Sequence, residues 1–214
     1  MALPPSPLRA IVFIDGANLY HALKTAGHRA NRIDPYKVAK KLVEFRTLVE
    51  MRYYIAEIDR TAPERIYRAH RELRALLATH ADIRVCTGHI QYLRETNPCA
   101  KELAGYLAGL SLRLPAEVFQ DLVGIASRHK EVTVHREKGV DVFLACDLVD
   151  LARRDVYDIA YLVSGDADFV PAVTIARSVG KRVFVASPDI AARLIRASDV
   201  AIRLTAGWFA GCEL

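Results

Sequence analysis

Short apolar runs alternate with helix-like segments through most of the 214-residue sequence. An apolar run without polar alternation is typical of a strand buried on both faces of a parallel sheet, and helices between such strands cover the two faces. The pattern predicts an α/β fold: a three-layer α/β/α sandwich with a mostly parallel central sheet. The predicted strands are residues 9–14, 51–56, 83–90, 159–163, 182–186 and 200–204, with a short alternating piece at 132–135.

Apolar residues at helical spacing mark the segments between these strands. The clearest segment is 63–80, where Ile66, His70 and Leu73 lie on one apolar face. We interpret His70 as a core histidine, and we assign no histidine to a metal because the sequence shows no His pair at ligand spacing. The predicted helices are residues 17–26, 33–45, 63–80, 101–112, 115–129, 139–153, 168–179 and 188–196.

Length and composition predict one domain over residues 1–214. Apolar residues make up 52% and charged residues 26%, which is ordinary globular usage and excludes a disordered chain. Between residues 91 and 130 two consecutive helices replace the alternation, so we interpret this segment as a helical insertion. Its residues Leu103, Leu107 and Leu110 either cap the core or form a homodimer contact, and spacing does not separate these alternatives.

A membrane protein and a secreted protein are both disfavoured. The longest stretch without Asp, Glu, Lys or Arg is 103–112, about half of the roughly 20 residues that a membrane span needs. The N-terminus lacks a basic start, and Asp15 interrupts the first apolar run, so no signal peptide is visible. The sequence therefore predicts a cytoplasmic protein that does not enter a membrane.

Cysteine spacing and net charge limit the partners. The cysteines show neither the paired spacing of a zinc site nor a secreted disulfide framework, which predicts idle thiols. The net charge of +5 suits a polyanionic partner without requiring one. The cysteines are Cys86, Cys99, Cys146 and Cys212.

Three short acidic segments stand at strand ends or helix starts. They are Asp15-Gly16-Ala17-Asn18, Lys138-Gly139-Val140-Asp141 and Ser164-Gly165-Asp166-Ala167-Asp168-Phe169. In open α/β sheets the site lies in the crevice outside the carboxyl ends of the strands, so we expect acids distant in the chain to meet there. Clustered carboxylates repel one another unless they bind a divalent cation or their pKa values rise. All-oxygen ligands favour Mg²⁺ or Mn²⁺ and chemistry on a phosphodiester.

Each acid also has a simpler interpretation. An aspartate after a strand is often a helix N-cap, so a cap is the alternative role for Asp168, ahead of the helix near residue 169, and for Asp141 on its own helix. Asp141 stands at a helix start, where the helix dipole favours its ionised form. Asp147 lies about 240° around the same helix, so we rank it as structural. Asn18 is a first-turn residue whose amide could instead orient a ligand or contact a phosphate.

Basic and aromatic residues surround the acidic segments. The cluster that leads to Asp141 is a candidate for holding a phosphate backbone; it comprises Arg128, His129, Lys130, Arg136 and Lys138. The arginines at 65, 68, 71 and 74 are more simply a solvated helix face. Four tyrosines either stack on unpaired bases or, as we prefer for strand positions, pack in the core; they are Tyr53, Tyr54, Tyr92 and Tyr106.

These three acidic segments, in this order, resemble the signature segments of NYN domains, in particular their LabA-like branch, within the PIN-like nuclease superfamily. The resemblance spans about residues 8–187, and the segment 91–130 departs from it. It implies a PIN-like sandwich and a ribonuclease that cuts single-stranded RNA with Mg²⁺ or Mn²⁺. By position, the catalytic and metal-binding residues would be Asp15, Asp141, Asp166 and Asp168, with Asn18, Arg136, Lys138 and Ser164 on the substrate.

Two other functions stay open. A non-catalytic RNA-binding or regulatory module would keep the fold and bind RNA without turnover. A small-molecule phosphohydrolase is weaker, because no Asp-x-Asp follows the first strand and position 17 is alanine. Dinucleotide-binding and P-loop proteins are excluded, since the sequence contains neither glycine-rich signature.

Overall fold

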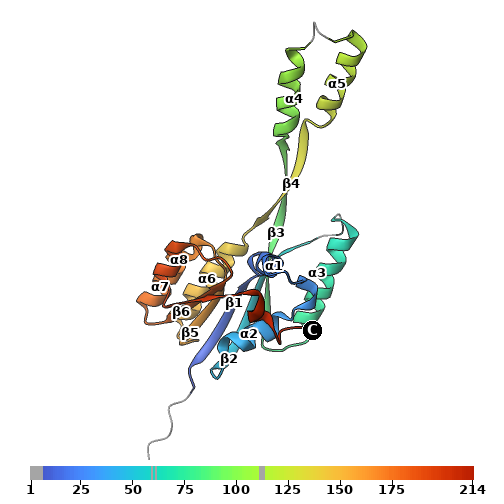
Figure 1. Ribbon diagram of the computed structural model, residues 1–214. Helices are drawn as coiled ribbons and strands as arrows, with labels where there is room; N and C mark the ends of the chain where they lie inside the picture. The colour runs from blue at the N-terminus through green and yellow to red at the C-terminus, as the bar shows by residue number, and fades with distance from the viewer. Residues whose placement is uncertain (1–6, 59, 61, 111–113) are drawn as a thin grey trace, which may run out of the picture. The chain divides into compact units, whose positions relative to one another are not determined.

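The structure is a computed structural model that describes residues 7–58, 60, 62–110 and 114–214. It divides into two compact units (Figure 1). The first unit holds the chain up to His89 together with Lys138–Leu214, and the second is Ile90–Glu137. Two expectations, the N-terminus without a signal peptide and a helix end at 112, fall on residues 1–6 and 111–113 and lie outside the described residues.

The strands form a sheet in the order β4-β3-β2-β1-β5-β6-β7. Hydrogen-bond pairing is parallel between β1 and each of β2 and β5, between β2 and β3, and along β5, β6 and β7. The predicted mostly parallel α/β fold is therefore confirmed. The strands are β1 (Arg9–Asp15), β2 (Thr47–Glu57), β3 (Ile83–Thr96), β4 (Glu131–Lys138), β5 (Ile159–Val163), β6 (Arg182–Ser187) and β7 (Val200–Arg203).

Helices cover both faces of the sheet in the first unit, with α6, α7 and α8 on one side and α1, α2 and α3 on the other (Figure 1). Short 3-10 helices are η1 (Ala30–Arg32), η2 (Ala167–Phe169) and η3 (Ala206–Phe209). The helices of this unit are α1 (Gly16–Thr25), α2 (Pro35–Val43), α3 (Glu64–Leu77), α6 (Val140–Arg153), α7 (Val170–Ser178) and α8 (Ala192–Ala197).

Side chains of alternate β1 residues point to opposite faces of the sheet. Val12 and Ile14 belong to the core cluster that includes Leu19 of α1 and Val38 of α2. Phe13 points the other way, where its ring meets Tyr157 edge-on at 6.0 Å. Because side chains alternate along a strand, Asp15 shares the face of Phe13, the face that α6 covers.

The second unit contains α4 (Pro98–Ala108) and α5 (Ala116–Arg128). Asn97 caps α4, since its side chain accepts hydrogen bonds from the backbone N–H groups of Cys99 and Ala100. Leu107 is buried, whereas Leu103 is 41% exposed. In the part of the chain that the structure describes, none of the helices has the length and hydropathy needed to cross a membrane.

Several boundaries differ from the predicted ones. β3 continues to Thr96 through residues 91–96, which alternate in exposure, so the first part of the 91–130 segment is a strand and not a helix. The predicted helix at 188–196 begins only at Ala192, because the preceding Ala191 donates its N–H to the carbonyl of Gly165 at 3.0 Å. Such long-range backbone bonds leave no periodic signal in the sequence.

Candidate active site at the carboxyl ends of the central strands

The order of the sheet reverses between β1 and β5. The chain builds β2 and β3 outward from β1 on one side, and β6 and β7 outward from β5 on the other. Open α/β sheets bind ligands at the carboxyl ends of the strands at such a switch point. Ile14 pairs with Val163, so Asp15 and Ser164 emerge side by side at this point.

Asp15 is held firmly at the end of β1. Its side chain is only 3% exposed, and its two oxygens accept three hydrogen bonds. Oδ1 accepts from the Asn18 backbone N–H at 3.0 Å, which caps α1, while Oδ2 accepts from Asn18 Nδ2 at 2.9 Å and Ser164 Oγ at 3.3 Å. A buried carboxylate requires such donors, and here they also fix its direction.

Asn18 and Ser164 join two segments that are distant in the sequence. Asn18 Oδ1 accepts the backbone N–H of Gly165 at 3.1 Å, and Ser164 Oγ accepts that of Asp166 at 3.2 Å. Both ends of the Asn18 amide are thus engaged within the protein. Asn18 and Ser164, which we expected to contact substrate, position the acidic segments in this structure.

The loop after β5 carries Asp166 and Asp168 to the surface. Asp166 caps the following η2, the role considered as an alternative for Asp168: its Oδ1 accepts the Asp168 backbone N–H at 2.9 Å. Both carboxylates are exposed. Gly165 is required here by close packing, since a Cβ at this position would lie 2.0 Å from the carbonyl oxygen of Asp189.

Asp141 lies in the first turn of α6. Gly139, the residue before this helix, has a left-handed backbone with φ of 85°. Its pKa is raised above the usual range, first by partial desolvation and then by the negative charges of Asp15, Asp166 and Asp168. The favourable helix dipole predicted from the sequence is therefore outweighed. The charges that raise this pKa belong to the segments that follow β1 and β5.

The donor set fits a hard divalent cation. All four groups are carboxylates, which Mg²⁺ and Mn²⁺ prefer, and a cation would relieve the repulsion that raises the pKa of Asp141. Among the described residues, no three His, Cys, Asp or Glu side chains are grouped closely enough to hold a metal ion. The residues that would hold a cation here are the fixed Asp15 and the exposed Asp141, Asp166 and Asp168.

The basic cluster is divided between the two units. Lys138 is exposed at the end of β4 in the first unit, three residues before Asp141. Arg136 belongs to the second unit, where it forms an ion pair with Glu95. The arginine ridge of α3 includes surface ion pairs of Arg68 with Glu64 and of Arg74 with Glu57, as a solvated face would.

Of the four tyrosines considered for base stacking, two lie in each unit. Tyr53 and Tyr54 of β2 are buried, 4% and 0% exposed, which confirms the packing interpretation for these two positions. Tyr92 and Tyr106 are exposed, at 41% and 67%, and both belong to the second unit.

The sequence did not predict a buried ionic cluster that lies beneath α6. Arg52 of β2, 7% exposed, pairs with Asp147 of α6 at 2.7 Å and with Glu50 at 2.9 Å. The Tyr54 hydroxyl donates to the same Asp147 carboxylate at 2.7 Å. The structural role predicted for Asp147 is confirmed, and an arginine inside a buried strand is the signal that points to such a partner.

The parallel sheet, its switch point and the carboxylates there define a three-layer α/β domain of PIN-like architecture. The family model of the NYN domain matches residues 9–97 and 112–205. The chain therefore belongs to the NYN domain family, a family of PIN-like nucleases whose members usually use divalent metals.

One solved structure supports the fold. A crystal structure of a protein of unknown function from Vibrio parahaemolyticus is similar, with a TM-score of 0.56 and 16% sequence identity over 95% of this chain and 96% of that one. At this identity the similarity concerns the fold alone. No curated protein matches the sequence.

Proposed function

We propose that this protein is a Mg²⁺- or Mn²⁺-dependent ribonuclease of the LabA-like branch of the NYN family, which hydrolyses phosphodiester bonds of single-stranded RNA. The observation that supports this function best is the parallel pairing of β1 with β5, which puts Asp15 and the loop of Asp166 and Asp168 at one edge of the sheet, where Asn18 and Ser164 hydrogen-bond the two segments together. Membership of a nuclease family agrees with it. We also propose a cytoplasmic location.

In this proposal the four carboxylates hold the cation, which supplies an activated water and neutralises phosphate charge when bound. Asp15 is the fixed ligand, because Asn18 and Ser164 hold both of its oxygens. Asp141, Asp166 and Asp168 are the exposed ligands that adjust to it. Lys138 binds a phosphate of the RNA, and Arg136, in the second unit, is a separate candidate for a phosphate contact.

We propose one NYN domain over residues 1–214, with 91–130 as an insertion.

We propose that the apolar side chains of the insertion form a homodimer contact, because Leu103 and Tyr106 of α4 are exposed. A concentration series in analytical ultracentrifugation tests this contact, since a Leu103→Lys, Tyr106→Lys variant should remain a monomer.

Cleavage of an end-labelled single-stranded RNA tests the proposed activity. We expect products with Mn²⁺ or Mg²⁺, none with EDTA, and none from an Asp166→Asn variant purified in the same way. The variant should fold, because asparagine can still accept the Asp168 N–H at this exposed cap. Salt-sensitive RNA binding without any cleavage by folded wild type would contradict the enzyme and favour the binding module.

A second prediction concerns Lys138. Replacing it with methionine is expected to weaken RNA binding equally for all RNA sequences. A plot of the logarithm of the binding constant against the logarithm of the salt concentration should become less steep by about 0.7, which is the slope for one phosphate contact on a single strand. Binding isotherms at several salt concentrations measure this slope. Lys40→Met, which removes an exposed lysine from α2, is the matched control. An unchanged slope for Lys138→Met would remove Lys138 from the interface.

A further inference from the structure

The outer face of α1 carries an aromatic ring and a cation. α1 starts where β1 ends, and it packs Leu19 and Leu23 into the core (Figure 1). Tyr20, His21 and Lys24 are exposed on the other face, as expected for a helix with 3.6 residues per turn. This face therefore presents side chains to solvent that the core does not use.

The same helix begins within the acidic site. Asn18, in the first turn of α1, donates to Asp15 at 2.9 Å and accepts the N–H of Gly165 at 3.1 Å. Because a helix rises about 1.5 Å per residue, Lys24 lies about 9 Å along the axis from Asn18. A strand with one phosphate at the carboxylates thus has its next nucleotides within reach of the outer face of α1.

Tyr20 offers a surface on which a base can stack. Its side chain is 54% exposed. The ring meets His21 edge-on, with centroids 5.6 Å apart and an interplanar angle of 79°. An edge contact occupies at most one face of a ring, so the other face remains for a ligand. Exposed aromatic rings of this kind stack on the unpaired bases of single strands.

The segment 16–33 supplies +3 of the chain's net charge of +5, since it contains three basic residues and no Asp or Glu. Lys24, Arg29 and Arg32 are all exposed, and none of them forms an ion pair with a carboxylate of the described residues. The arginine ridge of α3 differs, because Arg68 and Arg74 pair with glutamates. Uncompensated cations next to an aromatic ring favour a phosphate backbone with bases attached.

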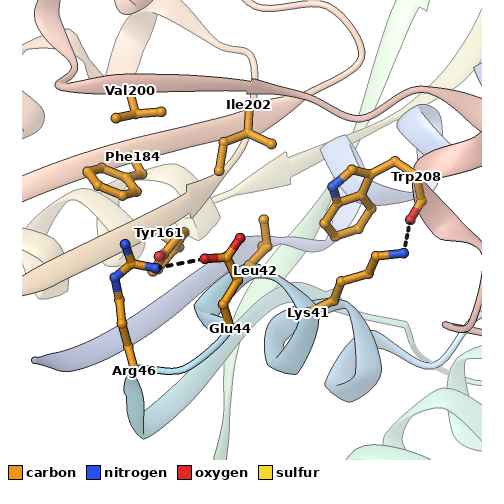
Figure 2. Close-up of a pocket in the computed structure, with 9 residues that line it drawn as sticks. All are labelled: Lys41, Leu42, Glu44, Arg46, Tyr161, Phe184, Val200, Ile202 and Trp208. Atoms are coloured by element: carbon orange, nitrogen blue, oxygen red, sulfur yellow. Dashed lines mark hydrogen bonds and ion pairs between the residues drawn. The ribbon is translucent and has the colours of Figure 1, made fainter. Parts of the chain in front are cut away.

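Two charged groups beside this segment are engaged within the protein. The Lys41 ammonium of α2 donates to the carbonyl of Trp208 at 2.7 Å (Figure 2). Glu213 lies next to η1, since it pairs with Ile33, but its carboxylate accepts the N–H of Gly211 at 2.8 Å. Because η1 also packs against α1, the three cations of the segment lie on neighbouring elements and remain for a partner outside the chain.

We propose that single-stranded RNA is held beside the acidic site by an α1 track, in which one base stacks on Tyr20 and phosphates of neighbouring nucleotides bind Lys24, Arg29 and Arg32. The identity of the strand rests on the proposed ribonuclease function. The track adds a substrate class to that function: an RNA that extends several nucleotides from the cut bond. Its contacts begin at the acidic site, continue about 9 Å along α1 to Lys24, and then pass to η1.

Binding of a labelled single-stranded RNA in EDTA tests the track in the absence of cleavage. With an RNA of about 20 nucleotides in about 0.1 M salt, the triple variant Lys24→Gln, Arg29→Gln, Arg32→Gln should bind at least tenfold more weakly. A plot of the logarithm of the binding constant against the logarithm of the salt concentration should become less steep by about 2, because three phosphate contacts contribute about 0.7 each.

A triple variant of α3 is the matched control. Arg65→Gln, Arg68→Gln, Arg71→Gln removes the same charge from another exposed helix face, so it should keep the wild-type slope. An unreduced slope for the Lys24, Arg29, Arg32 variant, or an equal reduction in the α3 control, would overturn the track.

Substitutions of Tyr20 separate base stacking from charge. Tyr20→Ala should weaken binding at least fivefold, which is the lower value for one stacked base, and should leave the salt slope unchanged. Tyr20→Phe keeps the ring and should bind like wild type. Because Tyr20 is exposed, neither substitution should lower the melting temperature. A Tyr20→Ala variant that binds as tightly as wild type would also overturn the proposal.

A cleavage assay distinguishes failure of the track from failure of the ribonuclease. With Mn²⁺, the Lys24, Arg29, Arg32 variant should cleave a trinucleotide at the wild-type rate, because its carboxylates are intact, and should cleave the long RNA with a raised KM. If wild type cleaves neither RNA while this variant still loses the salt slope and Tyr20→Ala still binds weakly, the track stands and the ribonuclease function fails. If wild type cleaves both RNAs and the variants bind and cleave the long RNA as it does, the ribonuclease stands and the track fails.

Discussion

Asp141→Asn is expected to lower the rate of metal-dependent RNA cleavage by about 10³-fold, the upper range for losing one electrostatic contact to the reacting group. Asparagine keeps the size and position of the side chain but removes the charge that would hold the cation. The rate is measured in single turnover with Mn²⁺ on an end-labelled single-stranded RNA. Circular dichroism of the same preparation verifies the fold.

Asp150→Asn is the matched control, since Asp150 lies on the same helix α6 in an exposed ion pair with Arg154 at 3.2 Å. This variant should cleave at the wild-type rate, because surface ion pairs contribute little. Full activity of a folded Asp141→Asn variant would remove Asp141 from the mechanism.

The stability of the Asp141→Asn variant tests the same electrostatics independently of activity. The folded pKa of Asp141 is raised above its ordinary value of 3.8. Its contribution to stability is therefore present below that ordinary value and is lost as the pH rises through the folded pKa. At pH 7 the variant should be at least as stable as wild type, and the difference should shrink on acidification to pH 4.

Metal binding gives a further signature of this site. Mn²⁺ should raise the melting temperature of wild type, because a ligand that binds only the folded state stabilises it, and should have little effect on Asp141→Asn. An equal shift in both proteins would place the cation elsewhere.

The central strands are the part of the fold that the sequence predicts most directly. β1 and β5 are buried on both faces, so residues 10–14 and Ile159–Val163 appear as uninterrupted apolar runs. β3 is different, because its residues beyond Ile90 are largely exposed and are held by strand pairing, which composition does not reveal. Strand edges and long-range backbone bonds therefore account for the wrong boundaries.

In the acidic site, too, local segments are visible in the sequence and long-range hydrogen bonds are not. Three local segments are enough to predict that Asp15, Asp141 and Asp166 approach one another, because parallel strands end at one edge. The bonds that fix them join Asn18 to Gly165 and Ser164 to Asp15, across 147 and 149 residues. No local pattern encodes such pairs, so the sequence does not reveal that Asn18 and Ser164 link the two segments; their contact with substrate stays a prediction.

The buried cluster of Arg52, Tyr54 and Asp147 carries the largest expected effect on stability. Asp147→Ala removes one of the two carboxylates paired with the Arg52 guanidinium, leaves the pair with Glu50, and deprives the Tyr54 hydroxyl of its acceptor. Burial raises the pKa of Tyr54, so this hydroxyl stays protonated and needs an acceptor. Losing one member of a buried ion pair is expected to lower the free energy of unfolding by about 3 kcal/mol. The melting temperature should fall by roughly 6–12 °C.

Two comparisons separate this ionic effect from a general weakness of α6. Asp150→Ala removes an exposed carboxylate from the same helix and should change the free energy of unfolding by less than about 0.5 kcal/mol. The triple variant Arg52→Met, Tyr54→Phe, Asp147→Leu removes every charge and hydroxyl of the cluster together, and it should be more stable than Asp147→Ala because no buried group is left unpaired. If denaturant unfolding shows Asp147→Ala to be as stable as Asp150→Ala, the cluster does not hold α6 against β2, and the position of Asp141 at the start of that helix must depend on apolar packing alone.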